Sequence, residues 1–124
     1  MMIIKNRWLP PKGFNAINLF GVIFTRKEKL SKQTLRHEAV HTAQMRELAY
    51  ILFYVWYLLE FVVRLFQYQN RRDAYRNVSF EREAFMYDTE AGYVIERKRY
   101  AFLNFKKKRD GKFNNFSQAT MAAD

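Results

Sequence analysis

The chain has 124 residues, of which 49% are hydrophobic and 18% aromatic, so it is long enough and apolar enough to fold as a globular domain. It contains no cysteine, which excludes disulfide frameworks, thiol nucleophiles and cysteine-type zinc sites. Its 22 basic and 12 acidic residues give a formal net charge of +10. We expect one domain over residues 1–116 and a flexible tail at 117–124.

The first residues predict a small β-hairpin. The runs "MIIKNRW" and "AINLFGVIFTRK" are rich in β-branched and aromatic residues, and the turn-forming "PPKG" lies between them. Gly21, inside the second run, indicates a bulge or a close approach of the backbone to another segment. The apolar patch at the start is shorter than that of a signal peptide and is followed at once by Lys5 and Arg7, so we expect a cytoplasmic protein.

A long helix is predicted next. Ser31 is a suitable N-cap, and neither Gly nor Pro occurs from Lys32 to about Tyr68. This helix runs into "LAYILFYVWYLL" (48–59), which is apolar on every face. Twelve uncharged residues are fewer than the about 20 that span a bilayer, so we expect a core helix. Its many aromatic residues leave a membrane-surface role open.

Two further elements follow. A polar, Asn-rich connector (67–79) precedes a predicted helix, "FEREAFMYDTEA" (80–91), for which Ser79 is a suitable N-cap. Residues 97–112 hold eight Lys or Arg against Asp110 alone and predict a basic C-terminal helix. The order of these elements predicts an α+β fold that is mainly α.

The chain has only two histidines and has both of them in "HEAVH", an H-E-x-x-H pattern in the first predicted helix. His37 and His41 are one helical turn apart, so their rings project from the same face and can bind one metal ion. Glu38 can then reach a water on that ion. A zinc ion held by three protein ligands lowers the pKa of such a water to about 7. Glu38 would take the proton and later pass it to a leaving amine.

A third ligand has to return to the histidines from later in the chain. Glu60 follows His41 with 18 residues between them, but an unbroken helix would separate the two by roughly 28 Å. The connector at 67–79 reverses the chain, which favours an acid of the following helix. That helix offers Glu81 and Glu83, which lie on different faces, so counting residues picks Glu60, helix geometry favours Glu81 or Glu83, and the choice stays open.

The H-E-x-x-H and "FEREA" segments together resemble the gluzincin metallopeptidases, in which a glutamate of a later helix completes a zinc site. The resemblance covers about residues 31–91, and the whole layout is similar to small bacterial proteins of minimal gluzincin type. It implies a zincin-like fold, Zn²⁺ as cofactor, a peptide substrate held along an N-terminal edge strand, and Glu81 as the third ligand beside His37 and His41. Ala84 would be a small packing residue one turn on.

Supporting roles are expected for other residues near the pattern. Many relatives carry an acid four residues after the ligand to hold one histidine, but this chain has Phe85 there, so Asp88 or Glu83 is expected to do so. Gln44 shares the helical stripe of the histidines and lines the cleft or its wall. The candidates for stabilising an oxyanion are Tyr75, Arg76 and Tyr87.

Two alternatives to a peptidase remain open on the sequence. A chain this short has little surface for a substrate cleft, which allows a metal-binding protein without catalysis. The basic segment at 97–112, where aromatic residues alternate with Lys and Arg, allows weak contact with a membrane surface or with phosphates of nucleic acid. The sequence does not determine the oligomeric state.

Overall fold

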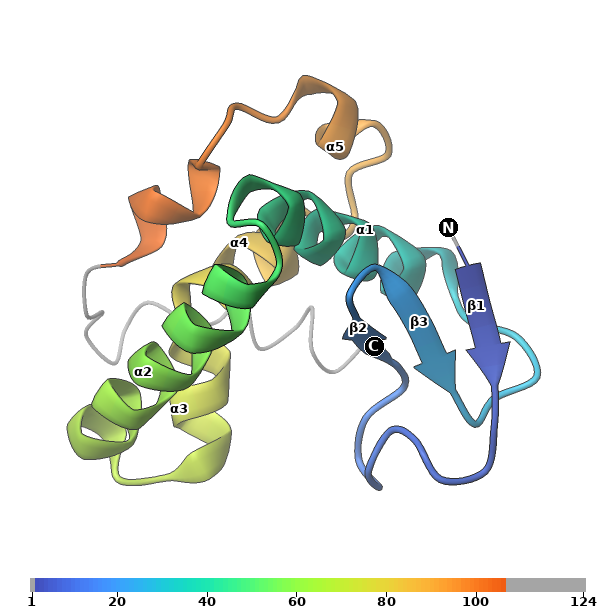
Figure 1. Cartoon of the computed structure of the whole chain (residues 1–124), viewed down its shortest axis with the longest axis horizontal. Helices are drawn as coiled ribbons and strands as arrows, with labels where there is room; N and C mark the ends of the chain where they lie inside the picture. Colours follow the sequence, from blue (N-terminus) through green and yellow to red (C-terminus); the bar gives the residue numbers. More distant parts are fainter. Residues whose placement is uncertain (1, 107–124) are drawn as a thin grey trace.

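The computed structural model describes residues 2–106 and has a small sheet followed along the chain by a group of helices (Figure 1). This arrangement confirms the predicted class, α+β and mainly α. The predicted boundary at residue 116 and the predicted tail at 117–124 lie outside the described residues.

The sheet has three strands, β1 (Met2–Lys5), β2 (Ile17–Leu19) and β3 (Val22–Thr25), in the order β1-β3-β2. The hairpin lies within the second predicted run rather than between the two runs, since β2 and β3 pair antiparallel and β1 pairs with β3 in parallel. Its two-residue turn is Phe20 and Gly21, with φ of 55° and 89°. Positive φ at both positions suits the twist of the flanking strands, so Gly21 serves a turn and not a bulge.

The predicted long helix is broken into α1 (Lys32–Glu47) and α2 (Ile51–Tyr68). Helix α1 ends in a Schellman turn, in which the Tyr50 N–H donates to the Met45 carbonyl at 2.8 Å. Ala49 has a φ of 53°, the left-handed conformation that glycine usually takes at this position. The expectation that the helix continues without a break is therefore wrong. The chain changes direction here, and α2 leaves α1 at a steep angle (Figure 1).

Helix α2 lies at the surface, so its interpretation as a core helix is wrong. Only Phe53 and Arg64 are buried along its length. One side packs aromatic rings onto the rest of the protein, and the opposite side exposes apolar side chains to solvent. The segment is therefore apolar on every face although only one of its faces packs against the protein.

The polar connector contains a helix of its own, α3 (Arg71–Asn77), which packs beside α2. Its N-cap is Asn70, whose side chain accepts hydrogen bonds from two backbone N–H groups of the first turn. Helix α4 (Ser79–Tyr87) follows directly. Val78 occupies its N-cap position, so Ser79 is the first residue of the helix rather than its cap.

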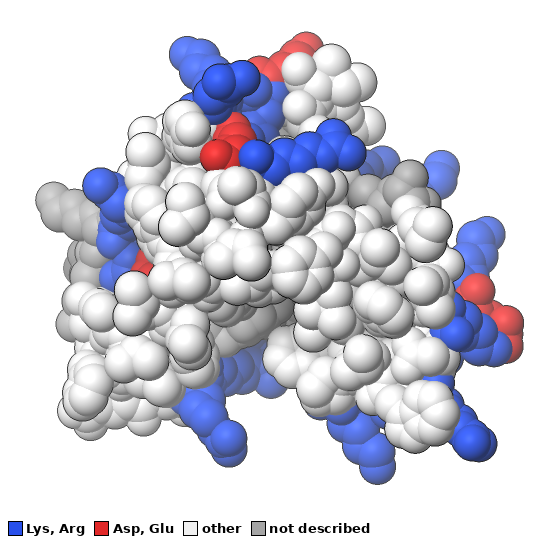
Figure 2. All heavy atoms as spheres, viewed as in Figure 1, with Lys and Arg blue, Asp and Glu red and all other residues white. Residues whose placement is uncertain are grey.

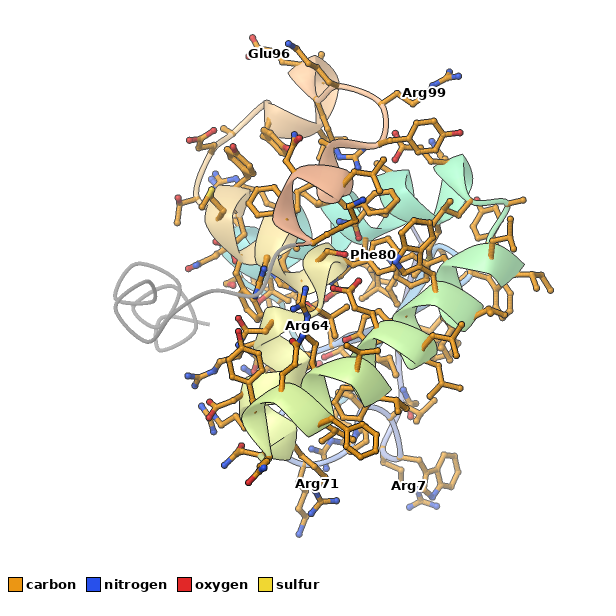
Figure 3. The ribbon with its side chains drawn as sticks, turned by 90° about the vertical axis from the view of Figure 1, so that its left-hand side faces the viewer. Arg7, Arg64, Arg71, Phe80, Glu96 and Arg99 are labelled. Carbon is orange, nitrogen blue, oxygen red and sulfur yellow. The ribbon has the colours of Figure 1, made fainter. Side chains whose placement is uncertain are left out.

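The hydrophobic core joins α1, α2 and α4 to the C-terminal part of the described chain. Its fully buried centre is Phe80, whose ring centroid lies 4.6 Å from those of Phe53 and Phe102 (Figure 3). The other members of the buried cluster are Met45, Leu48 and Val78. This core holds the first turn of α4 against α1, which is where the histidines lie.

Beyond α4 the chain forms α5 (Tyr93–Glu96) and a short 3-10 helix, η1 (Ala101–Phe105). Only η1 lies within residues 97–112, where a basic C-terminal helix was predicted. Arg97, the first basic residue of that segment, is extended (ψ 132°) and its guanidinium pairs with Glu47 at 2.8 Å inside the protein. Residues 107–112 of the basic segment lie outside the described residues.

Candidate metal centre

The two histidines lie on the side of α1 that faces α4. The predicted N-cap of α1 is confirmed, since the Ser31 Oγ accepts a hydrogen bond from the Thr34 N–H at 3.0 Å. His37 and His41 follow within the helix and are only 4% and 5% exposed. Their rings make an edge contact, with centroids 4.8 Å apart, as expected for side chains one turn apart.

Three side-chain atoms from two helices converge between the rings. The Nε2 atoms of His37 and His41 are 3.1 Å apart, and Oε1 of Glu81 lies 3.0 Å from each of them. Glu81 stands in the first turn of α4 and is 5% exposed. The structure thus brings together the three side chains that the resemblance implied as metal ligands.

Gln44 determines which nitrogen of His41 carries a proton. Its amide N–H groups donate to the Phe80 carbonyl and to Glu83, both at 3.0 Å, so its Oε1 is left to face His41. That oxygen lies 2.8 Å from Nδ1, and an amide oxygen can only accept. When neutral, His41 therefore carries its proton on Nδ1, which leaves the lone pair of Nε2 for a metal ion.

Asp88 has the same effect on His37. Its Oδ2 lies 3.3 Å from Nδ1 of the ring, and its Oδ1 accepts a hydrogen bond from the Gln33 side chain at 3.0 Å. An ionised carboxylate accepts only, so the neutral His37 ring also holds its proton on Nδ1. Of the two acids expected behind the histidines, Asp88 is the one that contacts a ring directly.

The converging atoms fit a metal ion. With both rings neutral, two nitrogen lone pairs and a carboxylate oxygen face one another, and a shared cation relieves the repulsion among them. Ligand atoms about 2.1 Å from one tetrahedral ion lie roughly 3.4 Å apart. The observed separations of 3.0 to 3.1 Å are close to that value. The buried group of His37, His41 and Glu81 could therefore bind a metal ion.

The same charges shift the pKa values of the group. Burial lowers the pKa of His37, but hydrogen bonds to Asp88 and Glu81 outweigh it and raise the pKa well above 6.5. Burial also lowers the pKa of His41, and the charge of Glu81 more than offsets this. Burial raises the pKa of Glu81, whereas the neighbouring His41 and His37 bring it well below 4.5. The carboxylate is therefore ionised and favours a positive charge between the rings.

Glu38, the predicted general base, is 7% exposed and lies between the histidines in α1. Its carbonyl accepts hydrogen bonds from Asn18 on β2 (3.0 Å) and from Thr42 (3.1 Å). Its charge contributes to the raised pKa values of both imidazoles, so the carboxylate is near the group. The hairpin thus packs on α1 at the residue where the predicted chemistry would occur.

Tyr57 of α2 also reaches the site, which the sequence did not reveal. Its hydroxyl donates to Oε2 of Glu81 at 2.7 Å. Burial, reinforced by the charge of Glu81, raises the pKa of Tyr57 well above 10, so the hydroxyl stays protonated. This contact depends on the direction that α2 takes after the break, and no local pattern in the sequence encodes it.

Glu83, the rival third ligand, points to the other side of α4. It is fully buried and accepts hydrogen bonds from Tyr93 (2.7 Å), Arg97 (3.0 Å) and Gln44. Glu83 therefore acts on His41 only through Gln44. Ala84 is fully buried, as the resemblance implied for a small packing residue.

Glu60 is not part of the converging group either. Its carboxylate accepts hydrogen bonds from the backbone N–H (2.7 Å) and the Oγ (2.5 Å) of Ser79, and it pairs with Arg64 at 3.1 Å. It thereby satisfies one free backbone N–H at the start of α4, that of Ser79, and supports the turn that carries Glu81. The expected separation of Glu60 from His41 assumed one unbroken helix, and that helix is in fact broken. Glu60 is nevertheless not a ligand, because Ser79 and Arg64 bind its carboxylate.

The three oxyanion candidates are spread around α3 and α4. The Tyr75 ring packs 6.1 Å from Phe85, which lies 4.4 Å from the His37 ring. Tyr87 instead stacks on Tyr93 at 3.9 Å. Burial lowers the pKa of Arg76, and its Nε is buried without a hydrogen bond. Tyr75 is therefore the candidate that the structure connects with the histidines, through one intervening ring.

Comparison of the chain with protein-family models, with curated proteins and with solved structures finds no match. The resemblance to gluzincins therefore depends on the motif and on the convergence of its side chains.

Proposed function

We propose that this protein is a zinc-dependent hydrolase of gluzincin type that cleaves peptide bonds. The observation that carries the proposal is the approach of His37 Nε2, His41 Nε2 and Glu81 Oε1 to within 3.0 to 3.1 Å of one another. Two imidazoles and one carboxylate are the protein ligands of one class of catalytic zinc sites. Zinc also fits the oxygen acceptors at Nδ1 of each ring, because the second nitrogen of a zinc-bound imidazole usually donates to a carboxylate or carbonyl oxygen.

The chain supplies the groups that this chemistry requires. When bound, zinc acts as a Lewis acid and lowers the pKa of a water ligand to about 7. In this proposal Glu38 accepts the proton of the attacking water and returns it to the leaving amine. The hydroxyl of Tyr57 donates its one proton to Glu81 and so orients the carboxylate that would hold the metal.

Metal content tests the first half of the proposal. The full chain, purified without chelators, should carry about one zinc ion, measured by mass spectrometry, because the three ligands define one site. His41→Ala should lose the ion and remain folded by circular dichroism. A wild-type chain that carries no zinc and does not bind added zinc at micromolar concentration would refute the proposal.

Hydrolysis tests the second half. With a fluorogenic peptide library as the probe, Glu38→Gln should keep the zinc and lose at least about a hundredfold in rate, the usual contribution of a general base. Glu90→Gln is the matched control, because it makes the same change at an exposed position on the chain. Equal activity of Glu38→Gln and wild type would exclude Glu38 as the base.

One observation favours a second function, a metal-binding protein without catalysis. The site residues are buried, with exposures between 4% and 7%, and α2 covers them through Tyr57 and Phe53. A catalytic zinc keeps one position open to substrate, whereas a structural zinc has four protein ligands. The absorption spectrum of the cobalt-substituted protein distinguishes the two, because added anions change it only when a coordination position is open.

A further inference from the structure

Helix α2 exposes a continuous apolar stripe. We call it the α2 outer face and define it by the residues that are 41% to 80% exposed: Ile51, Leu52, Val55, Leu58, Leu59, Val62, Val63 and Phe66. Their spacing of three and four residues puts them on one side along the whole helix. Soluble monomers rarely expose an apolar patch that is both continuous and this extended, and such patches mark contacts with proteins or membranes.

The opposite side of α2 is tied to the protein. Phe53 is in the core, Tyr57 holds Glu81, and the buried Arg64 pairs with Glu60. By length and composition α2 could cross a membrane, with a mean hydropathy of 1.4. Crossing would break these contacts and put the Glu60–Arg64 pair in hydrocarbon, which is costly. The helix can contact lipid while the fold remains intact only if it lies along the surface.

Basic residues surround the outer face. Figure 2 shows a broad uncharged surface over α2 and the β2–β3 hairpin, with Lys and Arg, and some Asp and Glu, at its edges. Arg71 and Arg72 follow the C-terminal end of α2 and are exposed. In Figure 3, Arg7 and Arg71 point away from the protein at the same end of the molecule. Arg7 lies over the ring of Trp8, which is 75% exposed, so an aromatic residue and a cation occupy this edge together.

A shallow groove of about 570 Å³ runs along one border of the face, between α2 and the end of η1. Its walls are mainly apolar and include Leu52, Val55, Leu59 and Val63, and the exposed Lys106 stands at its edge. An apolar channel beside a cation suits a lipid, because the acyl chain of a lipid is apolar and its phosphate is negatively charged.

We infer that the α2 outer face docks on an anionic lipid bilayer, with α2 parallel to the membrane surface. The apolar stripe enters the boundary between headgroups and acyl chains, and the surrounding Lys and Arg contact the lipid phosphates. The alternative occupant, a second copy, would bring two chains of net charge +10 together. The inference does not depend on the proposed hydrolysis.

Cosedimentation of the full chain with vesicles tests this inference. Binding to vesicles of phosphatidylcholine and phosphatidylglycerol should exceed binding to phosphatidylcholine alone by about tenfold and should weaken with added salt. Leu59→Glu puts a charge at the centre of the face, where the side chain is 63% exposed, and should weaken binding by about tenfold while the fold stays intact. Phe66→Glu, at one end of the face, should act in the same direction.

Ile95→Glu is the matched control. It makes the same charge change at an 89% exposed apolar residue of α5, an element that Figure 1 shows far from the C-terminal end of α2, and should leave binding within about twofold of wild type. Three outcomes would overturn the inference: wild type that does not bind anionic vesicles, equal losses in Leu59→Glu and Ile95→Glu, or a stable wild-type dimer that Leu59→Glu converts to monomer in sedimentation velocity.

Discussion

Asp88→Asn removes the negative charge behind His37 and keeps the size of the side chain. The carboxylate accepts from Nδ1 of His37 at 3.3 Å and from the side chain of Gln33 at 3.0 Å, and it is fully buried. An asparagine oxygen can still accept one of these hydrogen bonds. The substitution therefore reports mainly on the charge that orients the ring and makes its Nε2 a better donor of electrons to a metal ion.

The size of the effect follows from the hydrogen bond. A bond to a charged partner contributes about 1.5–3 kcal/mol, and one between neutral groups about 0.5–1.5 kcal/mol. The distance of 3.3 Å is at the long end for such a bond, so we take the smaller difference, about 1–1.4 kcal/mol. Zinc affinity should then fall by about five- to tenfold, at the lower limit of what residues behind metal ligands usually contribute.

Competition with a chromophoric chelator measures this change. Asp73→Asn is the control, because Asp73 is an exposed residue of α3 and the substitution removes the same charge. We expect the control to bind zinc like wild type and Asp88→Asn to bind one zinc with reduced affinity. If Asp88→Asn and wild type bind zinc equally, the ring contact has no influence on the metal, and the reasoning from this hydrogen bond fails.

Three further predictions concern pH, capping and the turn. Asp88 and Glu81 raise the pKa of His37 above 6.5, and metal binds only the neutral ring, so zinc affinity should fall as the pH decreases through that raised pKa. A zinc affinity that does not change with pH, measured by competition with a chelator, would contradict this. Glu60→Gln should cost about 1–3 kcal/mol in the free energy of unfolding, measured with urea, because it weakens the cap of α4, and its zinc stoichiometry should not change. Gly21→Ala should cost about 1–2 kcal/mol from its φ of 89° alone, since the nearest atoms to an added Cβ are 3.9 Å away; an unchanged midpoint of unfolding would show that the turn has relaxed.

The break between α1 and α2 could not be predicted from the residues that form it. Helix ends of this type usually carry glycine, and here Ala49 adopts the same left-handed conformation. The cost of that conformation is offset by burial of Leu48 and Phe53 on either side of the break. Such compensation comes from segments distant in sequence, above all Phe80 and Phe102, so no local signal records it.

The fold class and the paired histidines follow from local rules. Helical periodicity alone puts His37 and His41 on one face, and the absence of Gly and Pro predicts helix around them. Which of Glu81, Glu83 and Glu60 meets the histidines depended on how α4 packs against α1, because acids two residues apart point to different sides of a helix. The contact of Tyr57 with that site was equally beyond the sequence, since it requires the path of α2.

The sequence by itself determined the periodic features of this protein: a helix with two imidazoles on one side, and a later helix that begins with acids. Tertiary structure alone decided which acid meets the imidazoles and which side of α2 faces solvent. The physical reason is the range of the forces involved. Backbone geometry sets the spacing of neighbours along one helix, whereas the meeting of distant side chains depends on the burial of the whole core.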